Sequence, residues 1–163
     1  MAPGSCPRID PRICLGGSVS PGANDASEVR GTRETVETFL RLVGEGDADR
    51  LADAFAEEID WSVPGDGSLP WTGRRSHRHE VPEYFKVMWP TFVESESETA
   101  IDNILVDGAD AVVLGRFSHT VKANGRRFGT PVAIHLTVRH GSITRLHLYE
   151  DTYTVAKAVT AEA

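Results

Sequence analysis

The sequence predicts an α+β domain in which helices cover one face of a curved antiparallel or mixed sheet. Helical patterns come first, and three strand-like runs close the chain at residues 111–121, 128–139 and 142–153. Asn124-Gly125 and His140-Gly141 separate these runs, and tight hairpins favour such pairs because both central residues accept positive φ. Helices followed by hairpin strands are typical of the α+β class. We therefore expect a cone-shaped sheet wrapped around three helices and enclosing a pocket.

Two helices are predicted in the first 60 residues. Residues 28–43 place apolar side chains at helical spacing, and two glycines follow within three residues, so the first helix should end there. Asp47 can cap a second helix, whose buried stripe covers about residues 51–59. An extended segment and a Pro-Gly-Asp-Gly break follow at residues 60–67.

A third helix and a further strand precede the hairpins. The helix is predicted over residues 80–92, with Pro82 in its first turn, where a missing backbone N–H is tolerated. A strand is predicted near residues 100–106, and Asp107-Gly108 forms the turn after it. The apolar face of the third helix consists of Tyr84, Phe85, Met88, Trp89 and Phe92.

The composition indicates one globular domain and disfavours two classes of partner. The chain has 163 residues, of which 40% are hydrophobic and 25% charged, and its net charge is −7. Nucleic-acid binding requires clustered basic side chains, and the densest basic run, residues 74–79, is short. No apolar stretch reaches the roughly 18 residues of a membrane span, and the N-terminus lacks the apolar core of a signal peptide. We expect a cytoplasmic protein with no membrane partner.

The first residues form a separate region of the sequence. Residues 1–27 are rich in Pro, Gly and Ser and are expected to be a flexible tail, followed by a domain over residues 28–158 and a C-terminal tail over 159–163. Both cysteines, Cys6 and Cys14, lie in the N-terminal tail. Their spacing fits no common metal site, and they define no disulfide framework.

The two hairpin turns predict which side chains share a face of the sheet. Counting outward from Asn124-Gly125 places Phe117 opposite Val132, and counting from His140-Gly141 places His135 opposite Leu146. The face of interest would then carry Val112, Leu114, Arg116, Ser118, Ala133, His135, Thr137, Leu146, Leu148 and Glu150.

Three polar residues on this aliphatic face are candidate catalytic groups, because a buried charge is costly unless it is paired or used. His135 could act as general acid or base, or be a hydrogen-bonded core histidine. Glu150 could orient that histidine or act as a carboxylate of raised pKa. Arg116 could bind an oxyanion of a ligand, or only form an ion pair with Glu150 at the mouth of the cavity.

Large apolar side chains are candidate ligand contacts or plain core. Trp61, Tyr84, Met88 and Trp89 could line an apolar pocket, and the buried Tyr84 hydroxyl would need a partner. On the sheet, the candidates for ligand binding are Leu114, Ser118, Leu146 and Leu148.

The remaining titratable residues are weaker candidates. His77, His79 and Glu80 suggest a metal site only weakly, since side chains two apart on a helix diverge, so no metal is expected. By strand parity or position in a turn, the residues expected away from the pocket are His119, His140, His147, Asp60 and Asp151. A single β-bulge would reverse this parity.

Four segments carry a family resemblance: VETFLRLVGEGD at residues 36–47, FAEEIDW at 55–61, WTG at 71–73 and GSITRLHLYED at 141–151. With them, the chain resembles the SnoaL-like, ketosteroid-isomerase-related proteins of the nuclear transport factor 2-like superfamily over about residues 29–158. This superfamily hosts isomerases, epoxide hydrolases, polyketide cyclases, dehydratases and catalytically empty binders, so each chemistry must be tested at its own positions.

Compared with steroid isomerases of this family, the chain lacks two functional groups. The position of the general-base aspartate corresponds to Val63, and that of the oxyanion-hole tyrosine corresponds to Phe39. The protonated aspartate would fall at His135 and an active-site tryptophan at Glu150. The resemblance therefore argues against steroid-type isomerisation while keeping polar groups in the cavity.

The chain also lacks residues that two other activities of the family require. Limonene-epoxide-hydrolase-like members use an arginine and an aspartate two residues apart and a second aspartate on the last strand, which correspond to Arg116, Ser118 and Leu148. The last-strand aspartate of polyketide cyclases also falls near Leu148. The resemblance implies that the positions of Arg116, His135, Leu148 and Glu150 face the cavity.

We expect a cofactor-independent enzyme that acts by acid–base chemistry on a hydrophobic small molecule of secondary metabolism, polyketide- or terpenoid-like. Cyclisation, isomerisation, dehydration and hydrolysis all remain open. His135 and Glu150 would move the proton, and Arg116 would stabilise the oxyanion. The alternative is a non-catalytic ligand-binding or dimerisation module. Family members commonly pair sheet against sheet, so a homodimer through the sheet is expected.

Overall fold

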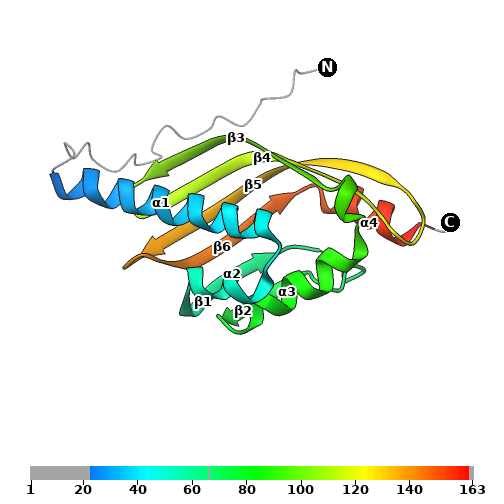
Figure 1. The fold of residues 1–163 in the computed structure, drawn as a ribbon, viewed down its shortest axis with the longest axis horizontal. Helices are drawn as coiled ribbons and strands as arrows, with labels where there is room; N and C mark the ends of the chain where they lie inside the picture. Colours follow the sequence, from blue (N-terminus) through cyan, green and yellow to red (C-terminus); the bar gives the residue numbers. More distant parts are fainter. Residues whose placement is uncertain (1–22, 66, 162–163) are drawn as a thin grey trace, which may run out of the picture.

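The computed structural model describes residues 23–65 and 67–161 as an open, six-stranded sheet with helices against one face (Figure 1). The principal helices are α1 (Ala23–Glu45), α2 (Ala48–Leu51), α3 (Glu80–Met88) and α4 (Thr152–Thr160). Short 3-10 turns are η1 (Ala52–Ala54), η2 (Trp89–Thr91) and η3 (Glu94–Glu96).

The strands form one mixed sheet with the order β2-β1-β6-β5-β4-β3. Only the β1–β6 pair is parallel, and the other four pairs are antiparallel. The expected α+β class and mixed sheet are confirmed. The strands are β1 (Phe55–Val63), β2 (Gly73–His77), β3 (Glu98–Asp107), β4 (Asp110–Thr120), β5 (Arg127–Arg139) and β6 (Ser142–Glu150).

The helices cover what we call the inner face of the sheet, and the opposite side is the outer face. α1 packs across β3, β4, β5 and β6, and α3 packs against α2 and β2 (Figure 1). On β5, the inner face consists of buried Val132, Ile134, Leu136 and Val138, which join the core with Leu146 and Leu148 of β6. The core therefore lies between this row and the helices.

The second helix is shorter than predicted because the chain turns extended at Phe55. Asp47 caps α2 as expected, with Oδ1 accepting from the Arg50 backbone N–H at 3.2 Å. Ile59, Trp61 and Val63 alternate with more exposed residues, which is the burial pattern of a strand. Ile59 thus belongs to a strand and not to the expected helical stripe.

Three other elements differ from the expectation. β2 was not predicted because its sequence, GRRSH, is polar and lacks apolar alternation, yet it pairs with β1 at the sheet edge. The last strand ends at Glu150, and Asp151 caps α4 by accepting from the Thr154 N–H at 3.0 Å. α1 begins at Ala23, whereas the first helix was expected from residue 28. Cys6, Cys14 and most of the predicted N-terminal tail lie outside the described residues.

The two hairpin turns differ in how well the sequence predicts them. His140 and Gly141 both have positive φ, 52° and 76°, which confirms the expected two-residue turn. At the other turn, Thr120 pairs with Arg127, so the loop spans more than Asn124-Gly125. Phe117 consequently faces Thr130 and not Val132. This shift of two residues leaves each side chain on its predicted face, since strand side chains alternate with period two.

A β-bulge between β5 and β6 changes the faces. Val138 pairs with Ile143, but the next pair is Thr137 with Arg145, so Thr144 is an extra residue on β6. His135 therefore lies opposite His147, and the predicted pairing with Leu146 is wrong. Every β6 side chain beyond the bulge lies on the face opposite to the one predicted from the turn.

Candidate functional site

The bulge separates the three residues that were predicted to be neighbours. Glu150 pairs with Val132 and so lies on the inner face with Leu146 and Leu148. Arg116 pairs with Pro131 on the other side of the sheet, and its side chain is exposed. His135 lies an odd number of residues along β5 from Val132, so its side chain is also on the outer face. The expectation that Arg116, His135 and Glu150 share a cavity face is therefore wrong.

Glu150 is the carboxylate of the inner face that burial perturbs most strongly. It lies half-buried at the end of β6, and burial raises the pKa of its carboxyl from 4.5 to about 7, with the charge of Asp151 adding to the shift. The side chain of Tyr84, on α3, is close enough for the two groups to interact electrostatically. Burial, and then the Glu150 charge, raise the pKa of the Tyr84 hydroxyl, which stays protonated at neutral pH.

An arginine that the sequence analysis did not single out lies beside Tyr84. Arg75 on β2 pairs with Trp61 on β1, and its guanidinium carbon lies 5.2 Å from the Tyr84 ring centroid and 5.8 Å from that of Trp61. Its Nη2 donates to the Trp71 carbonyl oxygen at 3.0 Å. Predicting β2 as a strand would have placed Arg75 on the face of Trp61.

Two N–H groups of this cluster are buried without a hydrogen-bond partner in the described part of the chain. One is Nη1 of Arg75 and the other is Nε1 of Trp61, whose side chain is 1% exposed. The Trp61 and Tyr84 rings meet at a centroid distance of 4.9 Å. Since buried donors are normally paired, these two are candidates for a ligand contact.

His119 also lies on the inner face, contrary to the expectation that it faces away from the pocket. Its ring stacks on Phe92 at 4.5 Å, and its Nδ1 lies 3.0 Å from Oγ of Ser97. The Ser97 hydroxyl donates to the Val93 carbonyl, so the imidazole Nδ1–H is the donor to Ser97. Burial, and next the charge of Arg127, lower the pKa of His119 to about 4, which keeps the ring neutral.

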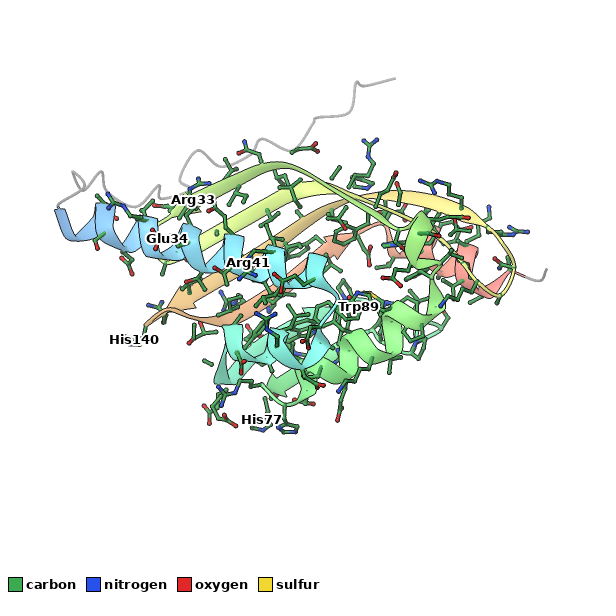
Figure 2. The ribbon with its side chains drawn as sticks, viewed as in Figure 1. Arg33, Glu34, Arg41, His77, Trp89 and His140 are labelled. Atoms are coloured by element: carbon green, nitrogen blue, oxygen red, sulfur yellow. The ribbon has the colours of Figure 1, made fainter. Side chains whose placement is uncertain are left out.

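The other predicted ligand contacts fall in three places. Trp89 and Phe85 line an open cleft of about 480 Å³ between the α1–α2 junction and the end of α3, with Lys86 and Asp49 paired at its edge. Figure 2 shows Trp89 near the C-terminal end of α1. Met88 is half-buried against the core. Leu114 and Ser118 lie on the outer face, in line with Arg116.

The outer face carries two histidine–aspartate pairs. Nε2 of His135 lies 3.1 Å from Oδ1 of Asp110, and Nε2 of His147 lies 3.0 Å from Oδ1 of Asp60. Arg145 adds a second contact to Asp60 at 3.1 Å. Asp60 and His147 therefore lie on the outer face, away from the inner face as expected. His135 lies on the outer face as well.

No group of three metal-ligating side chains comes together within residues 23–65 and 67–161. His77 and His79 stack on each other at 5.6 Å, and both are exposed. His77 and His140 lie at the surface, far from Trp89 (Figure 2). None of the helices in the described part of the chain combines the length and the apolar character needed to cross a membrane.

Comparison with known proteins identifies the family. The model of the SnoaL-like domain matches residues 36–146, more than half of the chain, and the protein belongs to this family. No curated protein matches the chain closely enough in sequence to count as a relative. Several of the solved structures that resemble it are described as nuclear transport factor 2-like proteins.

Three of these structures illustrate the range of the fold. A nuclear transport factor 2-like protein of Burkholderia xenovorans is 23% identical, with a TM-score of 0.69 over 81% of this chain and 98% of that one. A proposed isomerase of Rhodopseudomonas palustris is 20% identical, with a TM-score of 0.67 over 76% and 94%. A proposed SnoaL-like polyketide cyclase of Jannaschia is 19% identical, with a TM-score of 0.67 over 91% and 100%. At these identities, the similarity concerns the fold alone.

Proposed function

We propose that this SnoaL-like domain is an acid–base enzyme that binds a hydrophobic small molecule between α3 and the inner face and transfers a proton through Glu150. Polyketide- or terpenoid-like molecules of secondary metabolism fit this description, and cyclisation, isomerisation, dehydration and hydrolysis are the candidate reactions. The observation that carries the proposal is the position of the Glu150 carboxyl, half-buried on the mostly apolar inner face beside Leu148.

The chemistry of Glu150 suits proton transfer in either direction. A group whose pKa is about 7 exists in both protonation states at neutral pH, which is the condition for efficient general acid–base catalysis. Tyr84 stays protonated beside it and can donate a hydrogen bond to an oxygen that becomes negative during the reaction. His135 and Arg116 are not part of this proposed set, because the sheet separates them from Glu150.

The cleft beside α3 offers an access route. Phe85 and Trp89 line it with their rings 4.8 Å apart, and Phe85 in turn contacts Trp61 at 6.3 Å. An apolar molecule bound in the cleft against Phe85 and Trp89 would be separated from Trp61 by the ring of Phe85 alone. Met88, Leu146 and Leu148 are the remaining apolar candidates for its contacts.

The second candidate function is a binding or dimerisation module without catalysis, and the outer face favours it. Leu105 and Tyr149 are more than half exposed there, and Leu114 lies between their strands, on β4. A sheet with two apolar faces normally has both of them covered, and the helices cover only the inner face. We therefore propose that a second copy of the chain packs against the outer face. This interface is compatible with either function.

Native mass spectrometry of the purified protein would identify a co-purifying metabolite, whose conversion can then be measured. We expect Glu150→Gln to lower turnover by about 100-fold or more, with little change in substrate affinity. Glu83→Gln, on the exposed side of α3, is the matched control and should keep full activity. Turnover by Glu150→Gln within about threefold of the wild type would show that Glu150 does not transfer the proton.

A further inference from the structure

We propose that Arg75 and Trp61 bind an anionic oxygen of the ligand, so that the natural ligand is an organic acid, a carboxylate or an ionised enol, on an apolar body. This inference rests on the proposed function in one respect: it places the ligand in the same inner region. It differs in concerning recognition, not proton transfer.

The pairing of two edge strands brings both donors to the same place. Trp61 and Arg75 are directly opposite each other in the β1–β2 pair, so their side chains leave the same face of the sheet. The face is the inner one, because Trp61 is 1% exposed and contacts Tyr84 and Phe85 of α3. The Arg75 guanidinium lies against the Trp61 and Tyr84 rings, away from solvent on at least one edge.

In the described part of the chain, Arg75 lacks an anionic partner of the kind that its neighbours Arg74 and Arg78 have. Arg74 pairs with Asp60 at 3.1 Å and Arg78 pairs with Glu57 at 2.7 Å. Among residues 23–65 and 67–161, no carboxylate lies within ion-pair distance of Arg75, and its Nη2 donates to the neutral carbonyl of Trp71. A guanidinium carries five N–H donors in a planar fork that matches the oxygens of a carboxylate.

The two buried N–H groups require that a ligand bound here offer hydrogen-bond acceptors. Nη1 of Arg75 and Nε1 of Trp61 are both buried with no partner among the residues that the structure describes, and neither side chain can accept a hydrogen bond at these atoms. A buried donor without a partner is unfavourable, and a ligand oxygen would remove the penalty at both atoms. A ligand with only donors or only carbon at this point would leave it in place.

The charges around Tyr84 indicate how the ligand is oriented. The positive charge of Arg75 and the negative charge of Glu150 act on the Tyr84 hydroxyl with opposite sign, so both groups lie near Tyr84, the Arg75 guanidinium at 5.2 Å from its ring centroid. An anionic group would bind on the Arg75 side, where its charge is balanced. With the anionic group held on Arg75, the Glu150 carboxyl near Tyr84 would be available to exchange a proton with the apolar body.

A purely structural role for Arg75 predicts a different result. If the guanidinium only braces the Trp61 and Tyr84 rings, replacing it lowers stability but gives no preference between charged and neutral ligands. Benzoate and benzamide distinguish the two cases, because they have nearly the same shape and differ in charge and in having two acceptors or one. Titration calorimetry of the full chain at pH 8 measures both affinities.

We expect wild-type protein to bind benzoate at least about tenfold more tightly than benzamide. Arg75→Gln should abolish this preference, and Arg75→Lys, which keeps the charge but loses the fork, should retain only part of it. Arg74→Gln is the matched control, since the neighbouring arginine belongs to the Asp60 ion pair, and it should bind as the wild type does. If Arg75→Gln does not fold, the comparison of Arg75→Lys with the wild type still gives the answer.

Three results would overturn the proposal: no binding of benzoate at millimolar concentration, equal affinity of the wild type for both probes, or a preference that survives Arg75→Gln. The Glu150→Gln variant separates this failure from that of the proposed function. Glu150→Gln should keep the preference for benzoate, whether or not Glu150 has a catalytic role. If only the Arg75 variants lose the preference, anion binding is supported independently of turnover.

Discussion

The Thr144 hydroxyl donates a hydrogen bond to the carbonyl oxygen of Thr137 at 3.2 Å, at the point where β5 and β6 shift register by one residue. The extra residue at Thr144 decides which side chains of β6 face the helices. Without it, Glu150 would lie on the outer face and His147 on the inner one, since a shift of one residue exchanges the two faces of a strand. The proposed site depends on this bulge.

Deleting Thr144 should therefore prevent the native fold. The deletion would direct Leu146 and Leu148, each 5% exposed, toward the outer face and bury polar residues in their place. We expect a loss of about 3 kcal/mol or more in the free energy of unfolding, measured by urea denaturation. Thr144→Val keeps the residue count and loses only the hydrogen bond, so it should cost about 1 kcal/mol. A deletion variant as stable as Thr144→Val would show that the register adapts.

The pKa of Glu150 predicts how stability depends on pH. Because the folded protein holds the proton up to about pH 7 and the unfolded chain releases it near 4.5, the folded state loses stability as pH rises through this range. Glu150→Gln removes the loss. Between pH 5 and pH 8, we expect the variant to gain roughly 2 kcal/mol relative to the wild type, measured by urea denaturation at both pH values. Glu83→Gln, with its exposed side chain, should show no such gain.

The outer face predicts the oligomeric state. If a second copy covers Leu114 and Tyr149, a lysine at either position introduces a charge into the interface and should separate the copies. Light scattering with size-exclusion chromatography would then show a change from the mass of two chains to that of one. Val87→Lys is the control, because Val87 is 44% exposed on α3, away from the sheet. A wild-type protein that is a monomer at all concentrations contradicts the proposed interface.

The sequence predicts the order of elements better than it predicts the faces. Periodic apolar residues defined α1 and α3, and the turn at His140-Gly141 was correct because its backbone requirement is local. β2 was missed because its burial comes from pairing with β1, a long-range contact that leaves no apolar alternation in GRRSH.

The site was harder to predict, since both faces of β5 are apolar enough to be the core. Ala133 and His135 alternate with Val132 and Ile134, so periodicity alone could not decide which row faces the helices. The bulge at Thr144 has no clear sequence signal, and it separates His135 from Glu150. Glu150 lies on the inner face, as the family resemblance implied, but not on the face of His135 as the turn predicted, and placing Arg75 required knowledge of β2.

His119 should respond to pH with the opposite sign to Glu150. Burial lowers its pKa from 6.5 to about 4, so the unfolded chain binds a proton near pH 6.5 that the folded protein accepts only near pH 4. The His119 contribution to stability is therefore complete above pH 6.5 and is lost as pH falls through the range toward 4. Between pH 7.5 and pH 5, this loss amounts to roughly 2 kcal/mol, similar in size to the gain from Glu150.

The two contributions should nearly cancel in the wild type, and single variants should reveal each of them. From pH 7.5 to pH 5, we expect Glu150→Gln to lose roughly 2 kcal/mol of unfolding free energy and His119→Gln to gain about as much. The double variant should again be nearly independent of pH, because it carries neither group. His140→Gln, at the exposed hairpin tip, is the control for loss of a histidine. If the unfolding free energies of the two single variants change with pH in the same direction, at least one of these side chains does not point inward. A group that remains in water has the same pKa in the folded and the unfolded chain and adds no pH dependence.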